Sequence, residues 1–202
     1  MEPYVITLGR EFGSGGRSIA KRVAEILGIP CYDKELITMA AKKSGLSEQA
    51  IAASEKQRTG SLLYNLYTIG NDLPLGDQVF ILQSNIIKEL AEKGPCIIVG
   101  RCADYVLKNR PNVLRVFVHA SMEYRVARAA QRTGNEGKDT KTLTAEINRE
   151  TRRRASYYNY YTDNRWGDAE NYDISLSADL GVETCARIIE TAYRACEREV
   201  EA

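Results

Sequence analysis

The sequence predicts an α/β fold of three layers, in which a central parallel five-stranded sheet is flanked by helices. Two observations support this prediction. Short apolar runs of strand type alternate along the 202 residues with longer segments whose apolar residues recur at helical spacing. The first strand stands close to residue 1 and is followed directly by a glycine-rich turn and a helix. Alternating strands and helices fold as right-handed crossover units, which give parallel sheets covered on both faces.

The first strand, turn and helix occupy residues 4–28. Tyr4–Leu8 (YVITL) is aromatic and β-branched, and we expect it in the middle of the sheet. From Arg17 to Leu27 apolar residues recur at helical spacing, and Gly28 ends the helix. Ile29–Asp33 (IPCYD) follows as a short second strand.

Residues 34–77 are predicted to form an insertion that binds substrate. Its first part is typical of one or two helices with a break at Ser44–Gly45. Residues 59–77 mix glycine, asparagine, aspartate and proline with aromatic residues, which indicates a mobile connection rather than a core element.

The rest of the chain repeats the alternation. Cys96–Gly100 (CIIVG) is apolar throughout, as expected of a strand covered on both faces. Ser121 can cap a helix that runs to roughly Arg132. The other expected elements are a helix at 79–90, a strand at Val113–Ala120, a helix at Leu143–Tyr161, a strand at Tyr172–Asp179 and a final helix from Val182.

Composition argues against several classes of protein. Lys and Arg number 28 and Asp and Glu number 27, so a net charge of +1 gives no general attraction to nucleic acid or to a membrane surface. No apolar run approaches the ~18 residues of a membrane span and no secretion signal is recognisable, so we expect a cytoplasmic protein. Five cysteines without a CxxC pair argue against a disulfide framework and a zinc site. His119 ends a predicted strand, where it is either structural or a general base.

The turn after the first strand, GREFGSGGRS, is the strongest functional signal. In an open α/β sheet, phosphates bind where the first strand leads into its helix. Glycines there let successive backbone N–H groups point inward around phosphate oxygens. The phosphate-binding residues that we predict are Gly13, Ser14, Gly15, Gly16, Arg17 and Ser18.

This turn departs from the usual P-loop pattern G-x-x-x-x-G-K-[ST], because it has one extra residue and no lysine. In the preferred register Arg17 replaces the lysine as the cation, and Ser18 could be a ligand of Mg²⁺. In the other register Gly16 takes the position of the lysine. The cation then comes from Arg10, Arg17 or a later arginine cluster.

ITLGREFGSGGRSIAKRVAEILGIPCYDKELI (Ile6–Ile37) resembles the start of the cytidylate kinase-like family, relatives of the nucleoside monophosphate kinases within the P-loop superfamily. IIVGRCADYVL (97–107) and RRRASYYNYYTDNRWGDAENYDISLSADLG (152–181) are similar to later motifs of that family. The resemblance therefore spans nearly the whole chain. It implies a three-layer P-loop NTPase fold with a helical acceptor-binding insertion and an arginine-rich lid.

The helix expected at Leu143–Tyr161 separates two kinds of side chain. At 100° per residue, Leu143, Ile147, Arg154 and Tyr158 share one face, and Arg149, Arg152, Arg153 and Ser156 share the opposite one. The resemblance implies a lid that brings the second set of arginines to the transferring phosphate, where they stabilise its charge as catalytic residues. A solvated face paired with Glu146 and Glu150 is the alternative. The nearby tyrosines and Trp166 are expected to pack the lid against the core.

The resemblance also implies an acceptor site. Asp33 corresponds to the aspartate that follows the second strand in CMP kinases, and Arg101 corresponds to an arginine that holds the acceptor's phosphate. Val99 stands where those kinases have aspartate, and Asp104 could compensate. Structural ion pairing and helix capping are the other roles open to these residues.

The sequence thus predicts one P-loop kinase-like domain with a core at 1–33, 78–132 and 170–202, an acceptor-binding insertion at 34–77 and a lid at 133–169. With ATP and Mg²⁺ it would transfer a phosphoryl group to a small acceptor, a nucleoside monophosphate such as CMP in the first place. A non-catalytic nucleotide-binding protein and a kinase for another metabolite are the alternatives. Small-molecule nucleotides are the expected partners, and a homo-oligomer is left open.

Overall fold

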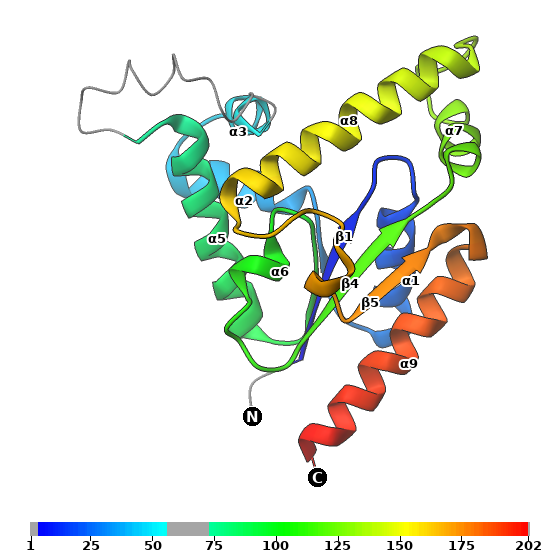
Figure 1. Cartoon of the computed structure of the whole chain (residues 1–202). Helices are drawn as coiled ribbons and strands as arrows, with labels where there is room; N and C mark the ends of the chain where they lie inside the picture. Colours follow the sequence, from blue (N-terminus) through cyan, green and yellow to red (C-terminus); the bar gives the residue numbers. More distant parts are fainter. Residues whose placement is uncertain (1–3, 56–72, 202) are drawn as a thin grey trace.

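The computed structural model describes residues 4–55 and 73–201 and contains one sheet of five parallel strands in the order β2-β3-β1-β4-β5. Helices cover both faces of this sheet (Figure 1). The predicted fold class is therefore confirmed, including the central place of the first strand. The strands are β1 Val5–Arg10, β2 Cys31–Tyr32, β3 Cys96–Val99, β4 Val113–His119 and β5 Ile174–Ser177.

Strand register shows which edge of the sheet gathers the carboxyl ends of the strands. Leu8 of β1 pairs with Val99 of β3 on one side and with Val116 of β4 on the other. All pairs are parallel, so the carboxyl ends of these strands meet at one edge. Residues that follow β1, β2 and β3 are thus brought together although they are far apart in the sequence.

The longer helices agree with the expected pattern except at the start of α5, and the short helix at 103–106 was not predicted. They are α1 Gly16–Leu27, α2 Glu35–Ser44, α3 Glu48–Ser54, α5 Leu75–Lys93, α6 Ala103–Val106, α7 Met122–Ala130, α8 Thr140–Tyr161 and α9 Val182–Glu201, with short 3₁₀ turns η1 at Ala169–Asn171 and η2 at Ala178–Leu180. The break at Ser44–Gly45 is confirmed, and Gly45 caps α2 with φ of 72°. Residues 75–77, the end of the connection expected at 59–77, are helical instead. They form the first turn of α5, which begins at Leu75 directly after Pro74. The rest of that connection, 59–72, lies outside the described residues.

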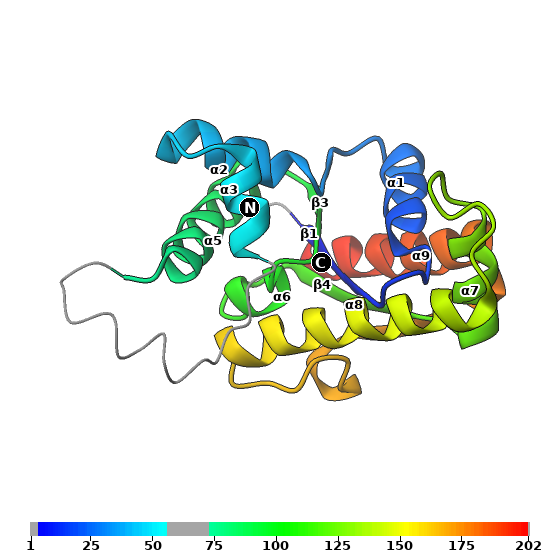
Figure 2. The ribbon, with the colours of Figure 1, turned by 90° about the horizontal axis from the view of Figure 1, so that it is seen from above.

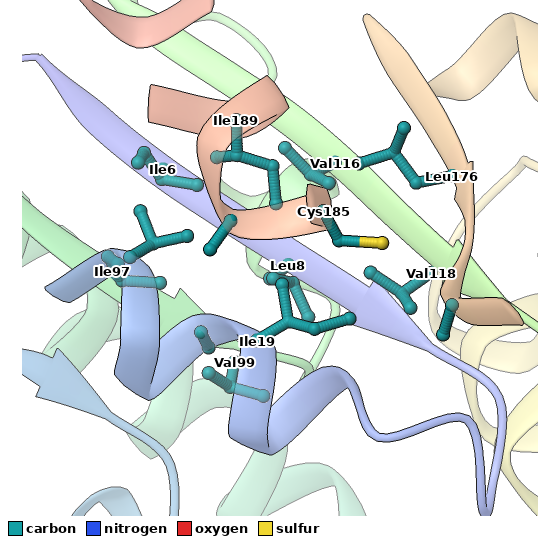
Figure 3. Close-up of a cluster of buried hydrophobic side chains, with 14 of the residues drawn as sticks. Ile6, Leu8, Ile19, Ile97, Val99, Val116, Val118, Leu176, Cys185 and Ile189 are labelled. Atoms are coloured by element: carbon teal, nitrogen blue, oxygen red, sulfur yellow. The ribbon is translucent and has the colours of Figure 1, made fainter. Parts of the chain in front are cut away.

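Two apolar cores hold the layers together. Ile6, Leu8, Ile97 and Val99 face α1 and α9, whereas Val5 and Ile98 face α2 and α5 on the other side. This alternation follows from the period of two along a strand. Figure 3 shows the first core, where Ile19 of α1 and Ile189 of α9 meet the strands.

Helix α8 runs across the molecule beyond the ends of the strands, as both views show (Figures 1 and 2). Ser121 caps α7 as predicted, because its hydroxyl accepts the amide hydrogen of Tyr124. Among residues 4–55 and 73–201, no helix has the length and apolar character needed to cross a bilayer. The division into core, insertion and lid stays a prediction.

The connection between β1 and α1 is tight. Gly13 and Gly15 have φ of 88° and 85°, in the region that favours glycine. Gly16 begins α1, and a Cβ added there would lie 2.6 Å from the Cβ of Arg10. The glycine therefore lets the helix start directly against the end of β1.

Burial predicts the cost of truncating α9. Ile189 is fully buried, whereas Ile188 beside it is 36% exposed. We expect Ile189→Ala to lower the free energy of unfolding by about 2–5 kcal/mol, because it removes core contacts and leaves a cavity. Ile188→Ala is the matched control and should change that free energy by about 0.5 kcal/mol or less. Urea unfolding measures both, and equal losses would contradict the assignment of the core.

Gly16→Ala tests the tight start of α1. The new methyl group would collide with Arg10, so we expect a loss of about 1–3 kcal/mol in the free energy of unfolding, although alanine favours helices. Gly76→Ala is the control in the first turn of α5, where a Cβ would meet the hydroxyl of Tyr161 at 3.2 Å. Urea unfolding should show little change for this variant. A Gly16→Ala protein as stable as wild type would disprove the close approach.

Candidate active site

A cavity of about 260 Å³ opens at the carboxyl edge of the sheet. Its wall comes from the ends of β1 and β2, from the turn after β3 and from α8. Arginines and aromatic side chains dominate this wall. The residues that the argument uses are Arg10, Arg17, Asp33, Arg101, Asp104 and Arg154.

Asp33 is the centre of the charged part of this pocket. Its carboxylate forms ion pairs with Arg10 at 3.5 Å, with Arg101 at 3.8 Å and with Arg17 at shorter range. Arg101 also donates a hydrogen bond of 2.7 Å to the backbone carbonyl of Asp33. The structure thus brings together both predicted acceptor residues and Arg17, with three guanidinium groups around one carboxylate.

Glu55, just past α3, supplies a second carboxylate that sequence reasoning did not identify. It accepts hydrogen bonds from Arg101 Nε at 3.0 Å and from Gln83 Nε2 at 2.6 Å. Glu55 belongs to the predicted insertion, where no motif marks it. Its pairing with Arg101 orients the guanidinium toward Asp33.

The turn after β3 carries backbone strain. Gly100, Arg101 and Cys102 all have φ between 55° and 75°. Such a conformation is unusual for residues with a side chain and costs about 1–3 kcal/mol each, so surrounding contacts must maintain it. The bonds from Arg101 to Asp33 and Glu55 supply those contacts.

The arginines of α8 divide differently from the predicted lid. Arg153 lines the pocket, whereas Arg152 is exposed and Arg149 is 71% exposed beside Glu150. Arg154, from the face that sequence periodicity grouped with Leu143, also lines the pocket. The inner face of α8 therefore carries a charged side chain, Arg154, into the pocket wall in addition to its buried apolar residues.

Arg154 and Arg10 lie together and are both partly buried. Arg154 donates a hydrogen bond of 2.9 Å to the backbone carbonyl of Arg10. Burial, to which the charge of Arg10 adds, lowers the pKa of Arg154 to about 8. Burial also lowers the pKa of Arg10 to about 10, while Asp33 acts in the opposite direction. Positive charge here is costly, so an anion in the pocket would be favoured.

The glycine-rich turn leaves backbone donors available. The amides of Ser18 and Ile19 donate to the carbonyl of Gly15, which begins α1. The amides of residues 13–17 donate no hydrogen bond to any described residue. Ser14 is buried, and its hydroxyl donates to the carbonyl of Glu11. Free amides at a helix N-terminus are the arrangement that binds phosphate.

Two arginines that sequence reasoning missed lie against this turn. Arg128 donates a hydrogen bond of 3.2 Å to the hydroxyl of Ser18, and its guanidinium lies over Gly15. Burial, followed by the charges of Arg128 and Arg17, lowers the pKa of Arg132. Their spacing of four residues in RVARAAQR was the available signal.

Phe12 and Arg125 connect the turn to α7 and α8. The guanidiniums of Arg132 and Arg154 lie 4.9 Å and 5.3 Å from the centre of the Phe12 ring, within the range of cation–π attraction. Arg125 donates to the carbonyl of Phe12 at 2.8 Å and pairs with Glu11 at 3.2 Å.

Val99 lies in the core, whereas Asp104 lies in the wall of the pocket. Val99 is fully buried in the core below the site. Asp104 lines the pocket and accepts a hydrogen bond of 2.6 Å from the hydroxyl of Tyr158. Burial raises the pKa of Asp104. His119 is exposed at the end of β4 and does not line the pocket.

Comparison with solved structures supports the same architecture. An uncharacterized protein from Eubacterium ventriosum has a TM-score of 0.70 at 29% identity, with 95% of this chain and 98% of that chain covered. Shikimate kinase from Bacteroides thetaiotaomicron has a TM-score of 0.56 at 16% identity, covering 95% and 98%. A gluconokinase from Sinorhizobium meliloti has a TM-score of 0.54 at 16% identity, covering 98% and 97%. The two kinases show the fold alone.

No curated protein matches the chain. The model of the cytidylate kinase-like family matches residues 5–180. This range includes the glycine-rich turn, the strained turn after β3 and the arginines of α7 and α8. The chain therefore belongs to the cytidylate kinase-like family.

Proposed function

We propose that the chain transfers the γ-phosphoryl group of ATP to a small anionic acceptor, with a nucleoside monophosphate such as CMP as the first candidate. The observation that supports this proposal is the meeting of two groups of arginines at one edge of the sheet. Arg128 and Arg132 lie against the glycine-rich turn, and Arg10 and Arg101 lie in the pocket. Arg17 lies between them, in the first turn of α1.

In this proposal the turn holds the phosphates of ATP. The amides of residues 13–17 surround the phosphate oxygens. Arg128 of α7 and Arg132, just past the end of that helix, neutralise their charge. Arg17 is the cation of the turn and contacts the transferring group. Phosphoryl transfer needs little covalent chemistry from the protein, so positioning and charge stabilisation supply the rate.

The acceptor would occupy the pocket. Arg101 and Arg10 attract its phosphate, and Asp33 holds both guanidiniums in place. Trp166 and Tyr158 provide aromatic surface for a base. Arg153 is the α8 arginine placed to assist transfer, and Arg149 and Arg152 take part only if α8 moves toward the nucleotide.

Residues near the turn fit a magnesium ion that is bound mainly by phosphates and water. No group of three or more His, Cys, Asp or Glu side chains in the described parts of the chain could hold a metal. Magnesium sites in kinases need only one or two protein ligands. Ser18 would be that ligand, in exchange for its hydrogen bond with Arg128. When bound, the ion would neutralise charge on the phosphates.

One observation favours a second candidate function, binding of a nucleotide without catalysis. The turn has no lysine, and Arg17, its replacement in the preferred register, is paired with Asp33. An arginine is longer and planar, so it keeps phosphate binding but alters the geometry that a compact ammonium provides.

The proposal is tested by coupled ADP release with MgATP and a panel of acceptors. We expect turnover with CMP, because the pocket combines arginines with aromatic surface. Tight ATP binding without turnover on any acceptor would favour the non-catalytic function. Activity only with acceptors unrelated to nucleotides would show that the proposed acceptor is wrong and that the proposed reaction, phosphoryl transfer from ATP, is right.

Substitution of Arg17 tests its role as the cation. We expect Arg17→Ala to weaken ATP binding by about tenfold to hundredfold, the value of a charged hydrogen bond to phosphate, and Arg17→Lys to retain most of the affinity. Isothermal titration calorimetry measures both. Arg22→Ala is the control, because Arg22 lies farther along α1 and pairs with Glu25 and Glu183. Unchanged affinity in Arg17→Ala would reject the preferred register.

A further inference from the structure

Arg125 of α7 is a buried arginine beside the glycine-rich turn, without a role in the proposed transfer. The residue is 5% exposed. Its guanidinium has three partners: it donates to the backbone carbonyl of Phe12 at 2.8 Å, pairs with Glu11 at 3.2 Å and donates to the hydroxyl of Thr151 on α8. A buried charge is costly unless it is paired and hydrogen-bonded, so these contacts hold the guanidinium in one place.

The glycine-rich turn packs directly against α7 at Arg125. A Cβ added to Gly13 would lie 3.1 Å from the Cβ of Arg125 and 3.4 Å from its backbone oxygen. The φ of 88° at Gly13 lies in the region that glycine enters freely. Glycine therefore offers little resistance to rotation of the peptide group between Phe12 and Gly13, and side-chain contacts must fix its orientation.

The hydrogen bond from Arg125 sets the direction of the amide of Gly13. The carbonyl of Phe12 and the N–H of Gly13 belong to one planar trans peptide group, in which these two bonds point in opposite directions. Because the carbonyl is directed at the guanidinium, the N–H points away from it. That amide donates no hydrogen bond to a described residue, so it is left for a ligand.

The two preceding carbonyls of the turn are restrained in a similar way. Arg154 of α8 donates to the carbonyl of Arg10 at 2.9 Å, and the hydroxyl of Ser14 donates to the carbonyl of Glu11 at 3.1 Å. A carbonyl oxygen that faced a phosphate would repel it, because both oxygens carry negative charge. Side-chain donors on three successive carbonyls thus favour a turn that turns its amides toward an anion.

We infer that Arg125 is a positioning residue for phosphate binding, because it keeps the Phe12–Gly13 peptide in the orientation that offers the amide of Gly13 to a triphosphate. Glu11 and Thr151 hold the guanidinium in place, so α8 supports the turn through Arg125. Arg125 acts without touching the phosphates. The inference rests on one part of the proposed function, in which the turn binds the phosphates of ATP.

NMR can observe the Phe12–Gly13 peptide alone. The chain has three phenylalanines, and only Phe12 precedes a glycine. Labelling with ¹³C-carbonyl phenylalanine and ¹⁵N-glycine therefore gives a single carbonyl–amide correlation signal. We expect tripolyphosphate and MgATP to shift this signal in the wild-type protein, because the amide of Gly13 gains a hydrogen bond to a charged oxygen. A signal that does not respond while MgATP binds overturns the inference.

Arg125→Lys tests the role of the guanidinium. A lysine keeps the charge beside Glu11, but a compact ammonium lacks the fork that reaches Phe12 and Thr151 as well. We expect MgATP and tripolyphosphate to bind about tenfold to hundredfold more weakly in calorimetry, the effect of one hydrogen bond to a charged group. The Phe12–Gly13 signal should also lose its response to both ligands. Wild-type affinity, or a wild-type response of the signal, overturns the inference.

Arg115→Lys is the matched control for a general loss of stability. Arg115 also has three partners that include a carboxylate, because it donates to the carbonyls of Val113 and Lys108 and pairs with Asp173. It lies on β4 opposite Thr7, before β1 reaches the turn, and it does not line the pocket. We expect wild-type affinity for MgATP and a wild-type NMR response. A loss of affinity equal to that of Arg125→Lys overturns the inference.

Thr151→Val gives a second test, which decides if Arg125→Lys does not fold. The substitution removes the hydroxyl that accepts from Arg125 and keeps the contacts of the guanidinium with Glu11 and Phe12. We expect tripolyphosphate to bind about two- to tenfold more weakly, with a weaker response of the Phe12–Gly13 signal. Unchanged affinity together with an unchanged response overturns the inference.

The outcomes separate this inference from the proposed function. MgATP binding without turnover on any acceptor removes the proposed transfer, and the binding and NMR results still decide the role of Arg125. A wild-type protein that binds neither MgATP nor tripolyphosphate contradicts both. Turnover with CMP together with unaltered nucleotide binding in Arg125→Lys supports the proposed function and overturns the inference alone.

Discussion

The arrangement of the site depends on one carboxylate. Asp33 follows β2, and the three guanidiniums around it come from the end of β1, the start of α1 and the turn after β3. Like charges at this separation repel, so an anion among them is required for the four segments to share one edge. The sheet order β2-β3-β1 makes the meeting possible, because it places these strand ends side by side.

The negative charge of Asp33 does not neutralise the positive charges of the arginines around it. Three arginines surround it, and Arg154 on the inner face of α8 adds another positive charge. The lowered pKa values of Arg10 and Arg154 express the cost of burying these charges. A chain with a net charge of +1 has thus concentrated positive charge in one pocket. An anionic ligand would relieve this local imbalance, so selectivity for anions needs no general electrostatic field.

The sequence predicts the frame of this protein well, because the frame rests on local rules. Alternating strand and helix patterns predict the parallel sheet, and the Ser121 cap and the break at Ser44–Gly45 follow from single residues. Asp33 and Arg101 were identified by resemblance, and the structure places them in contact. Their catalytic and binding roles remain proposals.

The remaining features depend on how elements pack, which local patterns do not contain. Periodicity separates the faces of α8 but does not say which face turns inward, so Arg154 was grouped with apolar residues while Arg149 was assigned to the lid. Arg128 and Arg132 gain their significance from the position of α7 against the glycine-rich turn. Glu55 reaches Arg101 across 46 positions of sequence.

The ring of Phe12 connects the glycine-rich turn to the wall of the pocket. It belongs to the turn, yet one of its cationic neighbours, Arg154, lines the pocket. Under the proposed function, a rearrangement of the turn around a triphosphate would therefore also move the guanidinium of Arg154. Thermodynamic linkage would make such an effect reciprocal, so that a ligand in the pocket would alter the affinity of the turn for phosphate.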